Sequence, residues 1–172
     1  MVDLPTTDLS DHDLATRPTV YAADALRNQV VLVSGGAGGI GRATAWLFAR
    51  LGAHVVLTGR DRAKLDLVVT HLTGHGLKAS AHEVDIREPD AVAALFDKVW
   101  DEQRRLDILV NSAGGQFPQA AIDFSIKGWN AVINTNLNGT WYMMQSAAQR
   151  WRERKHPGSI VNIVVVTTHG LY

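Results

Sequence analysis

The feature that most constrains this 172-residue chain is a run of glycines between a short apolar segment and a helix-like pattern. Residues 30–33 are apolar and largely β-branched, as in a strand buried on both faces. Glycines dominate residues 34–41, and Gly52 stands where a glycine commonly follows a helix. Between them, apolar side chains recur at helical spacing, at Ala43, Trp46, Leu47 and Leu51. The order predicts a strand that passes through a tight turn into a helix.

The same order of strand and helix recurs along the rest of the chain. Further strands are predicted at 55–57, 77–84, 108–110 and 160–166. Helices are predicted at 61–71 with Asp61 as the cap, from Pro89 past Val99, and over 126–151 as one long helix or two abutting ones. This alternation predicts an α/β fold with a doubly wound parallel sheet of five strands. The sheet domain is expected over residues 25–172, behind a polar, extended N-terminal arm at 1–24.

Charge and composition limit the class of partner. Seventeen Lys and Arg residues balance 17 Asp and Glu residues, whereas a nucleic-acid-binding protein carries a basic face, so no nucleic-acid partner is expected. The absence of cysteine excludes disulfides and thiolate metal sites. His71 and His75 have a possible metal spacing, but Gly74 between them marks a helix end, and no metal is expected. No stretch approaches about 18 apolar residues, so we expect a cytoplasmic protein without a membrane partner.

The glycines fit a phosphate-binding turn. Residues 36–41 satisfy G-x-G-x-x-G, and the same run satisfies a second spacing, Gly35-x-x-x-Gly39-x-Gly41, which Ser34 opens. Glycine suits this position because a side chain would keep a pyrophosphate away from the amides at the helix N-terminus. After a buried strand, the turn therefore predicts a Rossmann-type, dinucleotide-binding domain. The alternative is a tight loop in a purely structural domain.

The end of the second predicted strand distinguishes NAD from NADP. An acid there binds the ribose 2′-hydroxyl of NAD, whereas an arginine accommodates the 2′-phosphate of NADP. Arg60 precedes the first acid, Asp61, so Arg60 favours NADP(H), with Arg42 as a helper. The alternative for either arginine is a solvated surface position.

Further motifs follow in a fixed order, at residues 85–86, 111–114, 136–139 and 158–163. With the glycine turn, they resemble those of the short-chain dehydrogenase/reductase family from about residue 29 to the last residue, although Ser112 replaces an asparagine of the family pattern. The resemblance implies that Asp85 and Ile86 face the adenine ring and that Asn136 supports a proton relay. Together with the glycine turn and Arg60, the residues predicted to bind the cofactor are Ser34, Gly35, Gly36, Gly39, Ile40, Gly41, Arg60, Asp85, Ile86, Asn111, Ala113 and Gly114.

Three of these residues also fit structural roles. Asp85 fits a cap of the following helix, and Asn111 fits a residue that satisfies backbone groups across the sheet. Asn136 fits an ordinary exposed helix residue, because asparagine competes with helical hydrogen bonding wherever it lies.

Within the family, segments 114–117, 127–129 and 162–165 resemble the enoyl-CoA and 2,4-dienoyl-CoA reductases. That branch is NADPH-dependent and reduces double bonds of fatty acyl-CoA substrates. The resemblance thus implies an NADP(H)-dependent oxidoreductase that transfers a hydride to a small molecule, an enoyl-CoA or a related carbonyl or alkene compound.

The catalytic Tyr-x-x-x-Lys pair of the family is absent. Neither of the two earlier tyrosines has a lysine four residues later, and Tyr172 is the last residue. Val165 occupies the position of the family's serine, with Thr167 and Thr168 as the nearest hydroxyls. A non-catalytic NADP(H)-binding module or a truncated relic is therefore the alternative function.

The family continues through further strands and helices. We therefore expect this chain to be the N-terminal, cofactor-binding part of a longer, homo-oligomeric reductase. The strand predicted at 160–166 would then be a long apolar sheet edge, which predicts poor solubility or self-association of this chain alone.

Overall fold

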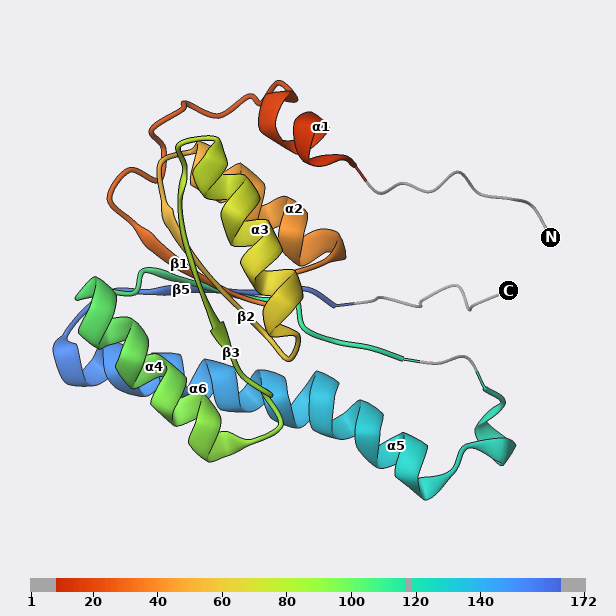
Figure 1. Ribbon diagram of the computed structural model, residues 1–172. Coiled ribbons are helices and arrows are strands. Elements are labelled where there is room, and N and C mark those ends of the chain that lie inside the picture. Colours follow the sequence, from red (N-terminus) through yellow and green to blue (C-terminus); the bar gives the residue numbers. More distant parts are fainter. Residues whose placement is uncertain (1–8, 117–118, 165–172) are drawn as a thin grey trace.

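The computed structural model of the chain describes residues 9–116 and 119–164. Its elements, in chain order, are α1 (Asp11–Thr16), β1 (Val30–Ser34), α2 (Gly39–Arg50), β2 (His54–Gly59), α3 (Arg62–Gly74), β3 (Lys78–Glu83), α4 (Pro89–Gln103), β4 (Ile108–Asn111), η1 (Ala121–Asp123), α5 (Ile126–Ile133), η2 (Asn134–Gly139), α6 (Thr140–Arg154) and β5 (Ser159–Asn162). The strands pair in parallel in the order β3-β2-β1-β4-β5. The predicted α/β fold with a doubly wound parallel sheet is confirmed (Figure 1).

Helices cover both faces of the sheet, with α2 and α3 on one face and α4 and α6 on the other (Figure 1). The central strand β1 is buried along its length, as its apolar sequence predicts. Its side chains alternate between two cores: Val31 and Val33 pack on the α2 and α3 side, and Val30 and Leu32 on the other side. The chain leaves β1 for β2 on one side and has β4 on the other, so the strand order reverses at the carboxyl end of β1. Ligands bind at this position in doubly wound sheets.

Single residues predict where several helices begin or end, and the structure confirms Asp61, Pro89 and Gly52 in these roles. The side chain of Asp61 accepts a hydrogen bond from the Lys64 amide at 3.1 Å and caps α3, which ends at Gly74, slightly beyond the expected end. Pro89 is the first residue of α4. Gly52 follows α2 with φ of 95°.

The N-terminal arm is not extended throughout, contrary to expectation. Residues 11–16 form α1, because Ser10 and Asp13 make a reciprocal capping box, with the Asp13 amide 3.1 Å from Ser10 Oγ and the Ser10 amide 3.0 Å from Asp13 Oδ2. Leu14 is buried in the core beside α2. Residues 1–8 of the predicted arm lie outside the described residues.

The long helix predicted at 126–151 is continuous but not uniform. The segments α5 and α6 are joined by a π-helical turn, η2. The helix projects past the sheet at its α5 end (Figure 1), so several of its apolar side chains remain exposed. These are Ile126, Trp129, Leu137 and Trp141. Further along, Met143, Ala147 and Trp151 are buried on the sheet, and the Trp151 indole donates to the Leu106 carbonyl at 2.7 Å.

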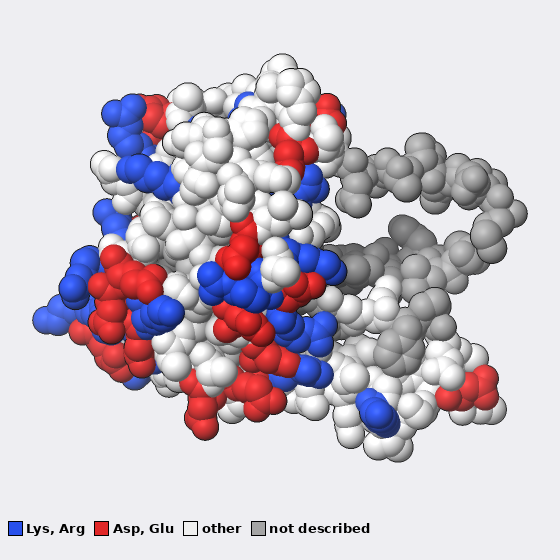
Figure 2. Space-filling model, viewed as in Figure 1, with Lys and Arg blue, Asp and Glu red and all other residues white. Residues whose placement is uncertain are grey.

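The strand β5 lies at one edge of the sheet and is shorter than predicted, with residues 165 and 166 outside the described part. Ile160, Val161 and Ile163 are exposed along this edge. On the face drawn in Figure 2, acidic and basic side chains are intermixed, and neither sign forms a continuous stripe. Within the described ranges, no helix has both the length and the apolar character that crossing a membrane requires.

Candidate nucleotide-binding site

The glycine turn is packed tightly against the ends of β2 and β4. Gly35 has φ of 73°, and its amide donates to the Thr58 carbonyl at 2.8 Å. A Cβ atom on Gly35 would lie 2.7 Å from the Ala113 nitrogen, and one on Gly41 would lie 2.2 Å from the Gly35 carbonyl oxygen. Both contacts are too short for any side chain, so the fold itself requires glycine at these two positions.

Gly38 and Gly39 differ from this pair because a Cβ atom on either would meet no atom within 4 Å. Gly38 precedes α2 as its N-cap and provides no side-chain hydrogen bond, so among the described residues no side chain caps the first amides of the helix. Bare backbone with open amides at a helix start fits the pyrophosphate of a dinucleotide. The donors and the space that this group needs are therefore present.

A cavity of about 660 Å³ opens beside this turn, within the size range of ligand sites. It is lined by Gly35, Ala37, Gly38, Gly59, Arg60, Asp61, Lys64, Val84, Asp85, Ile86, Arg87, Ala113, Gly114 and Thr135. Six of the predicted cofactor residues are among them: Gly35, Arg60, Asp85, Ile86, Ala113 and Gly114. The structure thus brings together, around one cavity, residues that follow four different strands.

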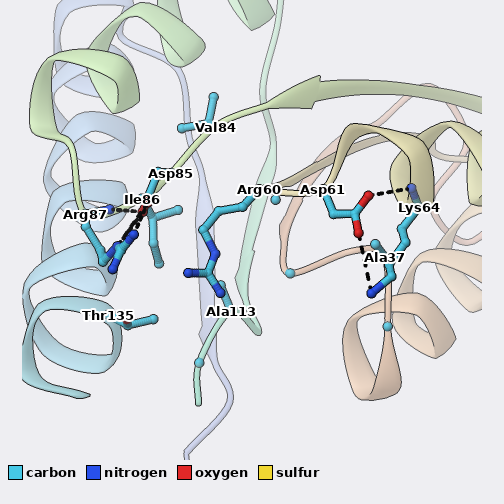
Figure 3. Close-up of a pocket in the computed structure, with 14 residues that line it drawn as sticks. Ala37, Arg60, Asp61, Lys64, Val84, Asp85, Ile86, Arg87, Ala113 and Thr135 are labelled. Carbon is cyan, nitrogen blue, oxygen red and sulfur yellow. Dashed lines mark hydrogen bonds and ion pairs between the residues drawn. The ribbon is translucent and has the colours of Figure 1, made fainter. Parts of the chain in front are cut away.

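Charged side chains surround this cavity in pairs, with Arg60 between them (Figure 3). Asp85 accepts from Arg87 Nε at 2.9 Å, and Asp61 lies 3.4 Å from Lys64 Nζ. Hydrogen bonds from Arg87 hold the pKa of Asp85 below its ordinary value, against the opposing effect of partial burial. Among the described residues, the Arg60 side chain makes no hydrogen bond or ion pair. It is therefore the cation that a ligand can use without breaking an existing pair.

Arg42, predicted as a helper of Arg60, does not line this cavity. Its guanidinium pairs with Asp11 of α1, with 2.7 Å between Nη2 and Oδ1, and also donates to the Leu9 carbonyl at 3.0 Å. The N-terminal arm therefore engages this arginine, a contact between residues too far apart in sequence for local patterns to reveal.

The other predicted residues of the turn do not line this cavity. Gly36 packs on Leu57, where a Cβ atom would lie 2.9 Å from Cδ2, and Ile40 is exposed in the first turn of α2. Ser34 is fully buried, and its hydroxyl has no hydrogen-bond partner in the described part of the chain. Gly39 lines a smaller neighbouring cavity.

The structural roles considered for Asn111, a partner of backbone groups, and for Asp85, a helix cap, are not the contacts that these residues make. Asn111 Nδ2 donates to the side chain of Asn162 on β5 at 2.9 Å, not to backbone groups, and its Oδ1 is buried without a partner in the described part. Asp85 accepts from the Arg87 amide at 3.0 Å, but the N-cap of α4 is Glu88. Ile86 is buried between the cavity and Gly139, where a Cβ atom would lie 2.7 Å from Ile86 Cγ1.

Asn136 lies in the π-helical turn η2 and binds the loop after β4. Its Oδ1 accepts from the Gly115 amide at 3.0 Å, and its Nδ2 donates to the Gly115 carbonyl at 2.9 Å. It is exposed, yet it is not an idle surface residue, because both side-chain groups hold one backbone unit next to Gly114. A π turn places Asn136 toward this loop, and such turns are frequent at functional sites.

Comparison with known proteins identifies the family. A family model described as short chain dehydrogenase matches residues 29–171. The chain belongs to the short-chain dehydrogenase family. This confirms the resemblance seen in the motifs, and members of this family are oxidoreductases that use a nicotinamide cofactor.

Individual relatives agree with this. The chain is 32% identical over 145 residues to a protein of Bacillus subtilis (strain 168) named a probable 2,4-dienoyl-CoA reductase, covering 84% of this chain and 57% of that protein. It is 33% identical over 147 residues to the 3-oxoacyl-acyl-carrier-protein reductase FabG of Thermotoga maritima, covering 86% and 58%. The solved structure of the citronellol catabolism dehydrogenase AtuB of Pseudomonas aeruginosa PAO1 superposes with a TM-score of 0.82 at 35% identity, covering 89% of this chain and 62% of that one. The chain thus spans little more than half the length of these curated relatives.

Several residues of this short-chain dehydrogenase site were not found by sequence reasoning. Lys64, Arg87 and Thr135 line the cavity, and the first two adjoin predicted positions: Lys64 is one turn after the Asp61 cap, and Arg87 follows Asp85-Ile86 directly. The position of the family's serine, Val165, and the nearby Thr167 and Thr168 lie outside the described residues. In the described part, no three His, Cys, Asp or Glu side chains gather to hold a metal ion.

Proposed function

We propose that this chain binds NADP(H) in the cavity beside the glycine turn. The observation that carries the proposal is Arg60 just after β2, where an NAD-binding domain places an acid; within the described ranges its guanidinium has no hydrogen-bond or ion-pair partner. The nearest acid, Asp61, is engaged by the Lys64 amide at 3.1 Å and by Lys64 Nζ at 3.4 Å. A 2′-phosphate therefore meets a free guanidinium, whereas a ribose 2′-hydroxyl finds no free carboxylate at this position.

We further propose that the chain is the cofactor-binding part of a short-chain reductase whose substrate is an enoyl-CoA or a related carbonyl or alkene compound. The names of the Bacillus subtilis and Thermotoga maritima relatives support an acyl thioester substrate. When bound, the reduced nicotinamide supplies the hydride. Asn136 positions the loop at Gly114 and Gly115 through its two hydrogen bonds. The same proposal includes a homo-oligomeric state and a cytoplasmic location for the complete protein.

A second function is a non-catalytic NADP(H)-binding module. It is favoured by one observation: no tyrosine in the chain is followed by a lysine four residues later. Both functions require cofactor binding, so only turnover separates them. Oxidation of NADPH by the complete protein in the presence of crotonyl-CoA supports the reductase, whereas binding without oxidation by the complete protein supports the module.

The cofactor assignment is tested by reversing the charge of Arg60. A hydrogen bond to a charged group contributes about 1.5–3 kcal/mol, so Arg60→Asp should weaken NADPH about 10- to 100-fold and change NADH less than about threefold. Arg62→Asp is the matched control, because Arg62 pairs with Asp66 on the surface of α3 and does not line the cavity. Fluorescence titration measures both affinities. Equal weakening of NADPH and NADH by Arg60→Asp would remove Arg60 from the site.

A further inference from the structure

A second, smaller cavity lies behind the glycine turn, between α2, α3 and the N-terminal arm. Its volume is about 310 Å³. It is lined by Asp11, Ala37, Gly38, Gly39, Arg42, Lys64, Leu67, Val68 and His71. Three of these residues, Ala37, Gly38 and Lys64, also line the larger cavity, so the two cavities adjoin each other.

One carboxylate, that of Asp11, binds two of the three basic residues that line this second cavity, Arg42 and His71. The third, Lys64, lies 3.4 Å from Asp61 through its Nζ atom. Asp11 Oδ1 is 2.7 Å from Arg42 Nη2 and 3.2 Å from Arg42 Nε, and Asp11 Oδ2 contacts His71 Nδ1. A residue of the arm thus places one oxygen on α2 and the other on α3. Partial burial opposes ionisation of Asp11, but hydrogen bonds from Arg42 and His71 outweigh it and lower its pKa.

The same donors match a phosphate group. A guanidinium that offers two N–H groups to one partner is the typical binder of phosphate as well as of carboxylate. His71 and the exposed ammonium of Lys64 add two further donors, and the cavity reaches the bare backbone of Gly38 and Gly39. The basic groups come from α2 and α3, whereas the only carboxylate among the lining residues comes from the arm.

The arm that carries Asp11 has few anchors. The helix α1 is six residues long and buries one side chain, Leu14. Apart from the Asp11 contacts, Arg42 donates to the Leu9 carbonyl at 3.0 Å, and Arg50 donates to the Leu14 carbonyl at 2.9 Å and the Arg17 carbonyl at 2.7 Å. Leu9 and Ala15 pack against the core only in part. Short segments with few buried contacts open locally at low free-energy cost. An anion of higher charge can therefore displace Asp11 while the sheet domain stays folded.

We propose that Arg42, Lys64 and His71 form a second anion-binding site beside the glycine turn, that this site takes a phosphate monoester or free phosphate, and that Asp11 occupies it as an internal competitor. The site is independent of the role assigned to Arg60. It predicts that binding of a phosphate group and docking of α1 exclude each other.

The test removes the charge of Asp11 and keeps its shape. Asp11→Asn should bind inorganic phosphate about tenfold more tightly than the wild type in calorimetry, and adding Arg42→Gln should abolish the gain. Asp24→Asn is the control, because Asp24 is exposed and pairs with Arg27 away from the cavity. A gain for 2′,5′-ADP over 5′-AMP, without a gain for inorganic phosphate, would assign the site to the 2′-phosphate of a nucleotide. No gain with either ligand would overturn the proposal.

A second measurement does not depend on the folding of Asp11→Asn. In the wild type, phosphate should accelerate amide hydrogen exchange in residues 9–17 as Asp11 leaves, and Arg42→Gln should show no such phosphate dependence. Unchanged exchange in the wild-type arm at saturating phosphate would also overturn the proposal. Neither readout uses NADPH, so failure here leaves the function proposed for Arg60 untouched.

Discussion

Two alanine substitutions in the glycine turn should separate cofactor binding from stability. A Cβ atom on Gly41 would lie 2.2 Å from the Gly35 carbonyl oxygen, whereas real Cβ atoms essentially never come closer than 3.0 Å, so backbone must move. Such overpacking lowers the free energy of unfolding by about 3 kcal/mol, and the higher helix propensity of alanine offsets about 1 kcal/mol of this loss. Gly41→Ala should therefore destabilise the chain by about 2 kcal/mol, which lowers Tm by about 4–8 °C.

Gly38→Ala should weaken cofactor binding while leaving the stability of the chain nearly unchanged. Gly38 has φ of −153° and open space beside it, so alanine fits without strain and Tm should change by less than about 2 °C. Its methyl group would stand where the pyrophosphate approaches the first amides of α2, so NADPH affinity should fall at least about tenfold. Thermal melts followed by circular dichroism and NADPH fluorescence titration measure the two effects. Wild-type affinity in Gly38→Ala would refute the assignment of the turn to the pyrophosphate.

Three further predictions concern the loop, the sheet edge and acid stability. Asn136→Ala should lower Tm by about 2–4 °C, because both hydrogen bonds to Gly115 are lost. The control Asn134→Ala loses only a hydrogen bond to Asn138 and should leave Tm unchanged, so equal shifts in the two variants would contradict the role of Asn136. The wild type should self-associate in light scattering through the exposed edge strand β5, and Val161→Lys should reduce this, so a monodisperse wild-type monomer would disprove it. Since hydrogen bonds from Arg87 lower the pKa of Asp85, the ionised carboxylate stabilises the fold fully at pH values above its ordinary pKa of 3.8. This stabilisation is lost as the pH falls through the lowered pKa. The difference in Tm between wild type and Asp85→Asn should thus vanish in acid, and a constant difference would be inconsistent with the pair.

The sheet and its cavity could be predicted because their signals are local. A buried strand needs an apolar run, a tight turn needs glycine, and a helix start needs a cap such as Asp61, and each of these occupies a few consecutive residues. Arg60, Asp85 and Gly114, each predicted from residues that follow a strand, line one cavity in the structure.

The contacts that the sequence did not predict join distant segments. Nothing near Arg42 in the sequence indicates that it pairs with Asp11, and nothing near Asn111 indicates Asn162 as its partner. The helix α1 is different, because the sequence does contain a local signal for it, Ser10 three residues before Asp13. The π turn at Asn136 has no local signature of its own.

Amide hydrogen exchange with and without NADPH reports directly whether this cavity holds the cofactor. Saturating NADPH should slow exchange in residues 35–42 and at the ends of β2 and β4, because the ligand covers the open amides of α2. Protection confined to other segments, or none at all, would contradict the account.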